Sequence, residues 1–349
     1  MKAIRKTLTP TDLAPFARAL GHTLNDVTRL RGGSKKGVYR LAFPDRSTAV
    51  AYVWSPDEDL WDVGPGDPRD PFSHASGLDL FTAAADRLAA AGVRAPRLLH
   101  ADPTHTHLPA DVAIVEDLPG GTLEDLLDGD LPAVSKTEAL KRTAALLDTL
   151  HACTGPRFGK VAVVDNGGSS YGGSCEAVVA ERALSDLDEL PARDPRAAAA
   201  HPQLSDALRT LASQVRPRTG PPTLIHGELG PDHVRVTPDG DLALIDIEGL
   251  MYFDAEWEHA FLHLRFGPHY DALRTEDTDG AEDTEETDGA EDTDGLDADR
   301  LRLYRLAMHL SLVAGPLRLL DVGDFHDPEF MRGIAEHNLR QALSFVERT

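Results

Sequence analysis

The chain has 349 residues, more than one small hydrophobic core usually organises, so we expect two domains or lobes. Its two cysteines, Cys153 and Cys175, argue against a disulfide-stapled secreted scaffold and against a thiolate zinc site. The formal net charge of −23 disfavours general binding of nucleic acid.

Apolar runs in the sequence are short. The first residues are basic but lead into no apolar run of signal-peptide length, and no later run approaches the roughly 20 residues that span a bilayer. We therefore expect a cytoplasmic protein with no membrane partner.

The amino-terminal part reads mostly as β-sheet. A short helix over 10–20 is followed by strands within 26–54, a helix over 77–92, and two more strands within 94–102 and 110–118.

After the segment "VEDLPGG" the pattern becomes helical. The spacing predicts helices over 136–152, 174–190, 203–216, 255–267, 300–321 and 327–347. It also predicts short strands over 223–226, 234–237 and 242–247, the last two joined by a "TPDG" turn. These patterns predict an amino-terminal lobe over 1–117 and a helical lobe over 118–349.

An acidic segment interrupts the second lobe. Residues 275–299 hold thirteen acids and no base, and without them the net charge would be −10. The segment contains a degenerate repeat with almost no apolar side chain. Because it cannot bury enough surface to offset the entropy of ordering, we expect a disordered insert over about 273–299 between two helices.

A glycine-rich turn between two predicted strands is the first candidate site. Its glycines allow backbone N–H groups to face a phosphate, while a serine and two lysines add a donor and positive charge. These candidate nucleotide-binding residues are Gly32, Gly33, Ser34, Lys35, Lys36 and Gly37. A plain hairpin turn with solvated lysines explains the same pattern.

Two polar clusters at predicted strand ends are the second and third candidates. The stretch "LIHGELGPDHVRV" places His226, Glu228 and His233 directly after an apolar strand, where scaffolds often present functional side chains. The stretch "LIDIEG" places Asp246 and Glu248 two residues apart, so on a strand they would face the same side and form an oxygen site for a divalent ion. A polar surface loop is the alternative.

Together these motifs resemble the aminoglycoside phosphotransferase family of small-molecule kinases, which has a bilobal, protein-kinase-like α+β fold. The family catalytic-loop pattern H-G-D-x₄-N resembles "HGELGPDH", and the family metal motif, which begins I-D and ends in an aspartate, resembles "IDIEGLMYFD". The resemblance implies ATP or GTP and Mg²⁺ as cofactors, and a small-molecule hydroxyl as acceptor. It assigns Glu228 as the catalytic carboxylate, with His226 and Asp254 bracing its loop. It assigns Asp246 and His233 to the metal, and Glu116 to the nucleotide-binding hinge.

Three departures from the family pattern fall on the chemistry. Glu228 is longer than the family aspartate, so its carboxylate reaches about 1.5 Å further. His233 offers nitrogen where Mg²⁺ prefers oxygen, which Asp232, Glu248 or water would then supply. The strand over 48–54 has Tyr52 where the family places a phosphate-binding lysine, so Lys35 or Lys36 would have to substitute.

Two functions remain open from the sequence. The first is a phosphotransferase that moves a nucleotide's terminal phosphate to an antibiotic, sugar or metabolite. The second is a kinase-like nucleotide-binding or regulatory protein without transfer activity. The carboxylates of Glu228 and Asp246 favour the phosphotransferase. We also expect the protein to be a monomer or a homodimer.

Overall fold

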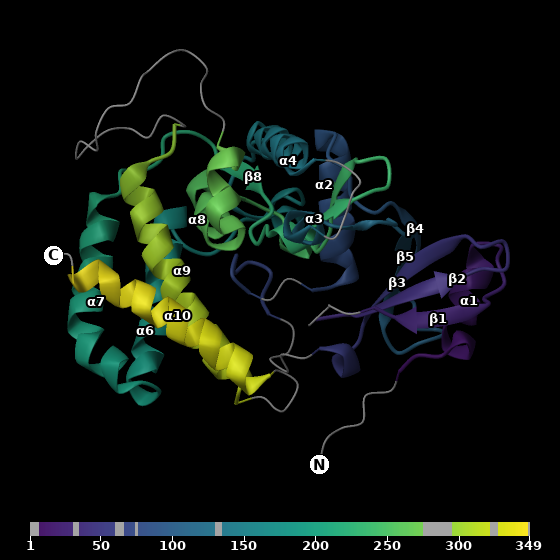
Figure 1. The fold of residues 1–349 in the computed structure, drawn as a ribbon, viewed down its shortest axis with the longest axis horizontal. Helices are drawn as coiled ribbons and strands as arrows, with labels where there is room; N and C mark the ends of the chain where they lie inside the picture. Colours follow the sequence, from purple (N-terminus) through teal and green to yellow (C-terminus); the bar gives the residue numbers. More distant parts are fainter. Residues whose placement is uncertain are drawn as a thin grey trace. The chain divides into compact units, whose positions relative to one another are not determined.

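A computed structural model describes residues 7–30, 35–59, 66–73, 76–129, 135–274, 295–321 and 327–347. Two compact units alternate along the chain, the first comprising residues 1–142, 159–169 and 231–251 and the second the remainder. Strands concentrate in the amino-terminal region and helices in the carboxy-terminal region (Figure 1), as the predicted α+β class requires. The predicted lobe boundary after residue 117 stays a prediction. The predicted insert lies mostly within 275–294, outside the described residues.

The first unit contains most of the strands. Its elements, with η marking a 3₁₀ helix, are α1 (Pro10–Ala19), β1 (Asp26–Arg29), β2 (Gly37–Ala42), β3 (Thr48–Trp54), η1 (Pro56–Glu58), α2 (Leu78–Ala91), β4 (Leu98–Asp102), β5 (Asp111–Glu116), β6 (Gly121–Thr122), α3 (Leu123–Asp128), β7 (Gly159–Lys160), α5 (Val161–Val164), η3 (Pro231–His233), β9 (Val234–Val236), β10 (Leu242–Leu244) and η4 (Ile247–Gly249). Helix α4 (Lys136–His151) begins in this unit and ends in the second.

A five-stranded antiparallel sheet dominates the first unit, in the order β1-β2-β3-β5-β4. Strand β2 alternates buried and half-buried residues, as expected where only one face is fully covered. Strand β3 is central, and its five consecutive buried residues show that both faces are covered. The register places Val38 of β2 opposite Tyr52 of β3.

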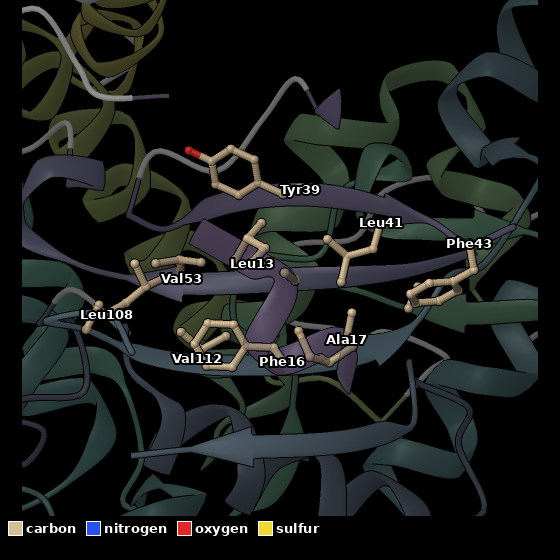
Figure 2. Close-up of a cluster of buried hydrophobic side chains, with 13 residues drawn as sticks. Leu13, Phe16, Ala17, Tyr39, Leu41, Phe43, Val53, Leu108 and Val112 are labelled. Atoms are coloured by element: carbon tan, nitrogen blue, oxygen red, sulfur yellow. The ribbon is translucent and has the colours of Figure 1, made fainter. Parts of the chain in front are cut away.

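Helix α1 covers one face of this sheet. Its apolar side chains Leu13, Phe16 and Ala17 pack on residues of β2, β3 and β5 (Figure 2). Thr9 caps the helix, and a proline follows at its first position, where a missing N–H costs nothing. The helix thus closes a core beneath the strands that lead into and out of the glycine-rich turn.

A second, smaller sheet has the order β10-β9-β6 and is antiparallel. Its β9–β10 hairpin turns over Thr237–Gly240, as predicted, with the Gly240 N–H donating to the Thr237 carbonyl at 2.8 Å. Gly120 precedes β6 with a φ of 112°, and a Cβ there would lie 2.1 Å from the Val236 carbonyl oxygen. Only glycine fits this approach.

The second unit is mainly helical. Its elements are α6 (Cys175–Glu189), η2 (Leu190–Ala192), α7 (Pro195–Gln214), β8 (Thr223–Ile225), α8 (Ala255–Phe266), η5 (Gly267–Leu273), α9 (Ala298–Leu319) and α10 (Pro328–Glu347). Strand β11 (Met251–Phe253) begins at the last residue of the first unit and continues into the second. Helix α10 packs against α9 and α7, and α9 also contacts α6 and α8 (Figure 1). Among the described helices, none combines the length and the apolarity that crossing a membrane requires.

Candidate active site

The segment after β10 presents Asp246 and Glu248 in the first unit. The predicted strand over 242–247 is wrong beyond Leu244, because Asp246 has a left-handed backbone (φ 58°) and η4 follows at once. A non-glycine residue in this region is strained by about 1–3 kcal/mol and is often found at functional sites. This left-handed conformation turns the chain after β10. Asp246 and Glu248 therefore face a common partner although they do not lie on a strand.

That common partner is Lys36, which directly precedes β2. Its Nζ donates to Asp246 Oδ1 at 2.9 Å and forms a short contact with Glu248 Oε1. The side chains of Lys36 and Glu248 are only 7% and 3% exposed, whereas that of Asp246 is 50% exposed. Burial alone would lower the pKa of Lys36, but the carboxylates of Glu248 and Asp246 outweigh burial and raise it. The two carboxylates therefore stabilise the charged form of the ammonium.

His233, the last residue of η3, lies near Asp246. Its Nε2 lies 3.7 Å from Asp246 Oδ2 and 3.6 Å from Asp232 Oδ2, beyond good hydrogen-bond length. The Ile245 N–H donates to the His233 carbonyl at 3.0 Å, which ties η3 to the segment before Asp246. The structure therefore brings His233, Asp246 and Glu248 into one neighbourhood, with Lys36 among them.

The donor set here suits a hard divalent ion. Asp246 offers an exposed carboxylate, and Glu248 Oε2 is buried without a hydrogen-bond partner among the described residues. Mg²⁺ is usually held by one or two carboxylates, with water and phosphate oxygens completing its shell. Within the described part of the chain, no three His, Cys, Asp or Glu side chains form a closed metal cage. An open site on Asp246 that a nucleotide completes fits these residues better.

The remaining candidates of the first unit have contacts of their own with other residues. Lys35 pairs with Asp59 at 3.0 Å, and Gly37 packs so tightly that a Cβ would lie 2.6 Å from the Glu58 carboxyl group. Glu116 ends β5 and pairs with two arginines, Arg94 at 3.4 Å and Arg97 at 3.2 Å. Gly32, Gly33 and Ser34 lie outside the described residues.

The stretch after β8 forms the candidate catalytic loop in the second unit. Within it Glu228 is exposed, while His226, Gly227 and Leu229 are buried. Gly227 has a φ of 90°, a conformation that favours glycine. The loop therefore projects one carboxylate outward from a buried backbone.

A buried glutamate of α8 holds this loop from beneath. Glu258 accepts the backbone N–H of His226 at 2.6 Å and that of Gly227 at 3.2 Å, and the N–H of Leu229 also donates to it. Burial raises the pKa of Glu258 to about 7, although these donors lower it in part. One carboxylate thus fixes the backbone on both sides of Glu228.

Asp254 precedes α8 and anchors a buried ionic network. It accepts hydrogen bonds from Arg300 Nη1 at 2.6 Å and from the Tyr304 hydroxyl at 2.5 Å. It also forms an ion pair with Arg218, whose Nε lies 2.8 Å from Asp254 Oδ1. Arg218 also binds Glu256, whose Oε1 accepts the Asp297 N–H at 3.0 Å. The network fixes the start of α9 to the start of α8, the helix that carries Glu258.

Comparison with known proteins identifies the family. A sequence model described as the phosphotransferase enzyme family matches residues 16–298. The chain belongs to the phosphotransferase enzyme family. No curated protein sequence matches it.

This member of the phosphotransferase family has the same kinase-like fold as several solved structures. A thermostable mutant of aminoglycoside phosphotransferase APH(4)-Ia is 19% identical with a TM-score of 0.61, over 93% of this chain and 97% of that one. Spectinomycin phosphotransferase APH(9)-Ia, in complex with ADP and spectinomycin, is 12% identical with a TM-score of 0.63, over 97% and 98%. Choline kinase LicA from Streptococcus pneumoniae is 12% identical with a TM-score of 0.59, over 97% and 99%.

Sequence reasoning missed several residues of the two sites. It assigned no site role to Glu258, Arg218, Arg300 or Tyr304. A signal was present in "FDAEWEHAF", because acids at 254 and 258 are one helical turn apart within an apolar run and so face the interior together. Partners from distant segments, such as Arg300, leave no local pattern.

Proposed function

We propose that this phosphotransferase transfers the terminal phosphate of ATP or GTP to a hydroxyl group of a small molecule. The observation that carries the proposal is the exposed carboxylate of Glu228 on a loop whose backbone is fixed by Glu258. Phosphoryl transfer requires little covalent chemistry from the protein and depends on positioning and charge. A fixed backbone with one outward carboxylate supplies such positioning.

In the proposed reaction the acceptor hydroxyl oxygen attacks the terminal phosphorus, and the bond from that phosphorus to the bridging oxygen breaks. The nucleoside diphosphate leaves with the electron pair, and the hydroxyl proton passes to Glu228. Asp246 would hold Mg²⁺, which neutralises phosphate charge when bound. His226 and Asp254 would keep the loop in place without touching substrate.

The acceptor is proposed only as a class. Proteins of the same fold have been solved with hygromycin B and with spectinomycin, and another is a choline kinase, so their acceptors are small and hydroxylated. The acidic composition suits such a ligand better than nucleic acid. Cytoplasmic location and a monomeric or homodimeric state complete the proposal.

A radiolabel assay tests this function. The protein is incubated with γ-labelled ATP or GTP, Mg²⁺ and a panel containing aminoglycosides, spectinomycin, choline and sugars. We expect labelled product with at least one acceptor, and Glu228→Gln should lower kcat about a hundredfold or more with little change in nucleotide KM. Glu181→Gln, an exposed carboxylate on α6, is the matched control. Equal turnover by Glu228→Gln and wild type would overturn the role of Glu228.

A second candidate function is nucleotide binding without transfer. The observation that favours it is Tyr52, which occupies β3 where the family pattern has a lysine. The two functions differ in whether binding depends on metal and leads to turnover.

A further inference from the structure

Strand β3 and helix α2 both lack a residue that kinase-like sites use. Such sites pair a strand lysine, which binds nucleotide phosphates, with a glutamate on the following helix. Here β3 reads "TAVAYVW" without lysine, and α2 reads "LDLFTAAADRLAAA" without glutamate. Asp79, the first acid of α2, is exposed. The usual ion pair therefore cannot form from these two elements.

We propose that Lys36 and Glu248 rebuild this ion pair, with Lys36 as the phosphate-binding lysine and Glu248 as its positioning residue. The inference rests on the proposed function. Lys36 Nζ lies 5.0 Å from the centre of the Tyr52 ring, so its ammonium reaches the position on β3 where the lysine is missing. Helix α2 packs against η4, the segment that carries Glu248. Both charges thus come from segments adjacent to the two elements that lack them.

The surroundings of Lys36 are those of a ligand-binding cation. An ammonium group has three N–H donors, and the contacts with Asp246 and Glu248 use two of them. Glu248 holds the ammonium from the buried side, while Asp246 is half exposed and opens toward solvent. A phosphate oxygen can approach from that open side. Stability alone explains the arrangement poorly, because a buried ion pair is often no more stabilising than apolar residues of similar size.

Lys35 provides a matched control. It is the neighbouring residue, has the same charge, and pairs with Asp59 at 3.0 Å. Its contacts involve neither Asp246 nor Glu248 among the ion pairs of the described residues. A general effect of positive charge in this turn would appear in variants of both lysines, whereas the proposed role belongs to Lys36 alone.

Calorimetric binding of ADP with Mg²⁺ to the full chain tests the role of Lys36. We expect Lys36→Met to weaken ADP at least about tenfold, since it removes a charge-assisted hydrogen bond to phosphate, and Lys35→Met to stay within about twofold. The double variant Lys36→Met/Tyr52→Lys, which returns an ammonium to β3, should recover part of the affinity. Unchanged ADP affinity in folded Lys36→Met would overturn the inference.

Removing one partner of a buried ion pair can unfold a protein, so a second variant is required. Lys36→Met/Glu248→Met removes both charges together and is expected to fold. It should also bind ADP at least about tenfold more weakly than wild type. If it binds ADP as tightly as wild type, the pair is only structural and the inference fails.

Variants of Glu248 test its positioning role through their effects on the nucleotide KM and on kcat. Glu248→Gln should raise the nucleotide KM more than it lowers kcat, and Glu248→Asp should recover part of the loss, because it acts by holding Lys36 and not on the transferred phosphate. Equal effects of Glu248→Gln and Glu248→Asp on the nucleotide KM would contradict this role.

The inference and the proposed function can fail separately. If wild type binds ADP through Lys36 but phosphorylates no acceptor, the proposed function fails and the inference stands. If it transfers phosphate and Lys36→Met is unchanged, only the inference fails.

Discussion

Glu258 shows how one side chain can determine the geometry of a loop. It is fully buried, and its carboxylate accepts backbone N–H groups on either side of Glu228. Among the described residues it forms no ion pair, and backbone amides compensate its burial. Such compensation is incomplete, and burial raises the pKa of Glu258 to about 7.

This pKa predicts a specific pH dependence of stability. Between about pH 4.5 and 7 the folded protein retains a proton at Glu258 that the unfolded chain releases. The contribution of Glu258 to stability is therefore complete below pH 4.5 and decreases as the pH rises toward 7, by roughly 3 kcal/mol in all. Glu258→Gln should remove this decrease.

Denaturant unfolding at a series of pH values measures the effect. The free energy of unfolding of wild type minus that of Glu258→Gln should fall between pH 4.5 and 7 and be level above pH 8. Groups common to both proteins cancel in this difference. Glu181→Gln should give a difference that is level throughout, and parallel curves for Glu258→Gln would show that Glu258 does not titrate in this range.

At the scale of elements, the start of α9 is fixed to the start of α8 by buried charges. Arg300 is 1% exposed and contacts Asp254, Glu176 and the carbonyl of Arg216. Because Asp254 immediately precedes the helix that carries Glu258, this network supports the loop of Glu228 indirectly.

Arg300→Met tests this network. It would leave the buried Asp254 and the half-buried Glu176 with a reduced set of donors, so we expect a loss of about 3–5 kcal/mol of unfolding free energy. Arg302→Met, an exposed position on the same helix, should change stability by no more than about 0.5 kcal/mol. Chemical denaturation of both variants measures the contrast. Similar losses in the two would mean that the network is not the cause.

Periodicity predicted most elements because their packing is local in the sequence. The strands within 26–54, the helix over 77–92 and the β9–β10 hairpin are confirmed. Helix α7 begins at Pro195, well before the predicted residue 203, and it contains Pro202 in its interior. The strand expected to reach residue 247 stops at Leu244, since nothing in "IDIEG" marks the left-handed backbone of Asp246. The partners of Lys36 were also hidden, because they lie more than two hundred residues away.

For the whole molecule, the comparisons identify the family and the fold and do not identify the acceptor substrate. A model of the phosphotransferase enzyme family matches residues 16–298, and proteins less than 20% identical share the fold over more than 90% of this chain. Identity this low transfers fold but not substrate. A ligand that every active member needs, the nucleotide, is therefore a better first probe than any acceptor.

Nucleotide-dependent stabilisation separates the two proposed functions. A ligand that binds only the folded protein stabilises it by about 2.7 kcal/mol at a hundredfold excess over its Kd, which for a chain of this size raises the thermal midpoint by several degrees. If Asp246 holds Mg²⁺ for an active enzyme, stabilisation by ADP should require Mg²⁺ and should fall sharply in Asp246→Asn. Stabilisation that is equal with Mg²⁺ and with a chelator, and unchanged in Asp246→Asn, would favour nucleotide binding without transfer. The metal dependence thus reports on the chemistry of Asp246 before any acceptor is known.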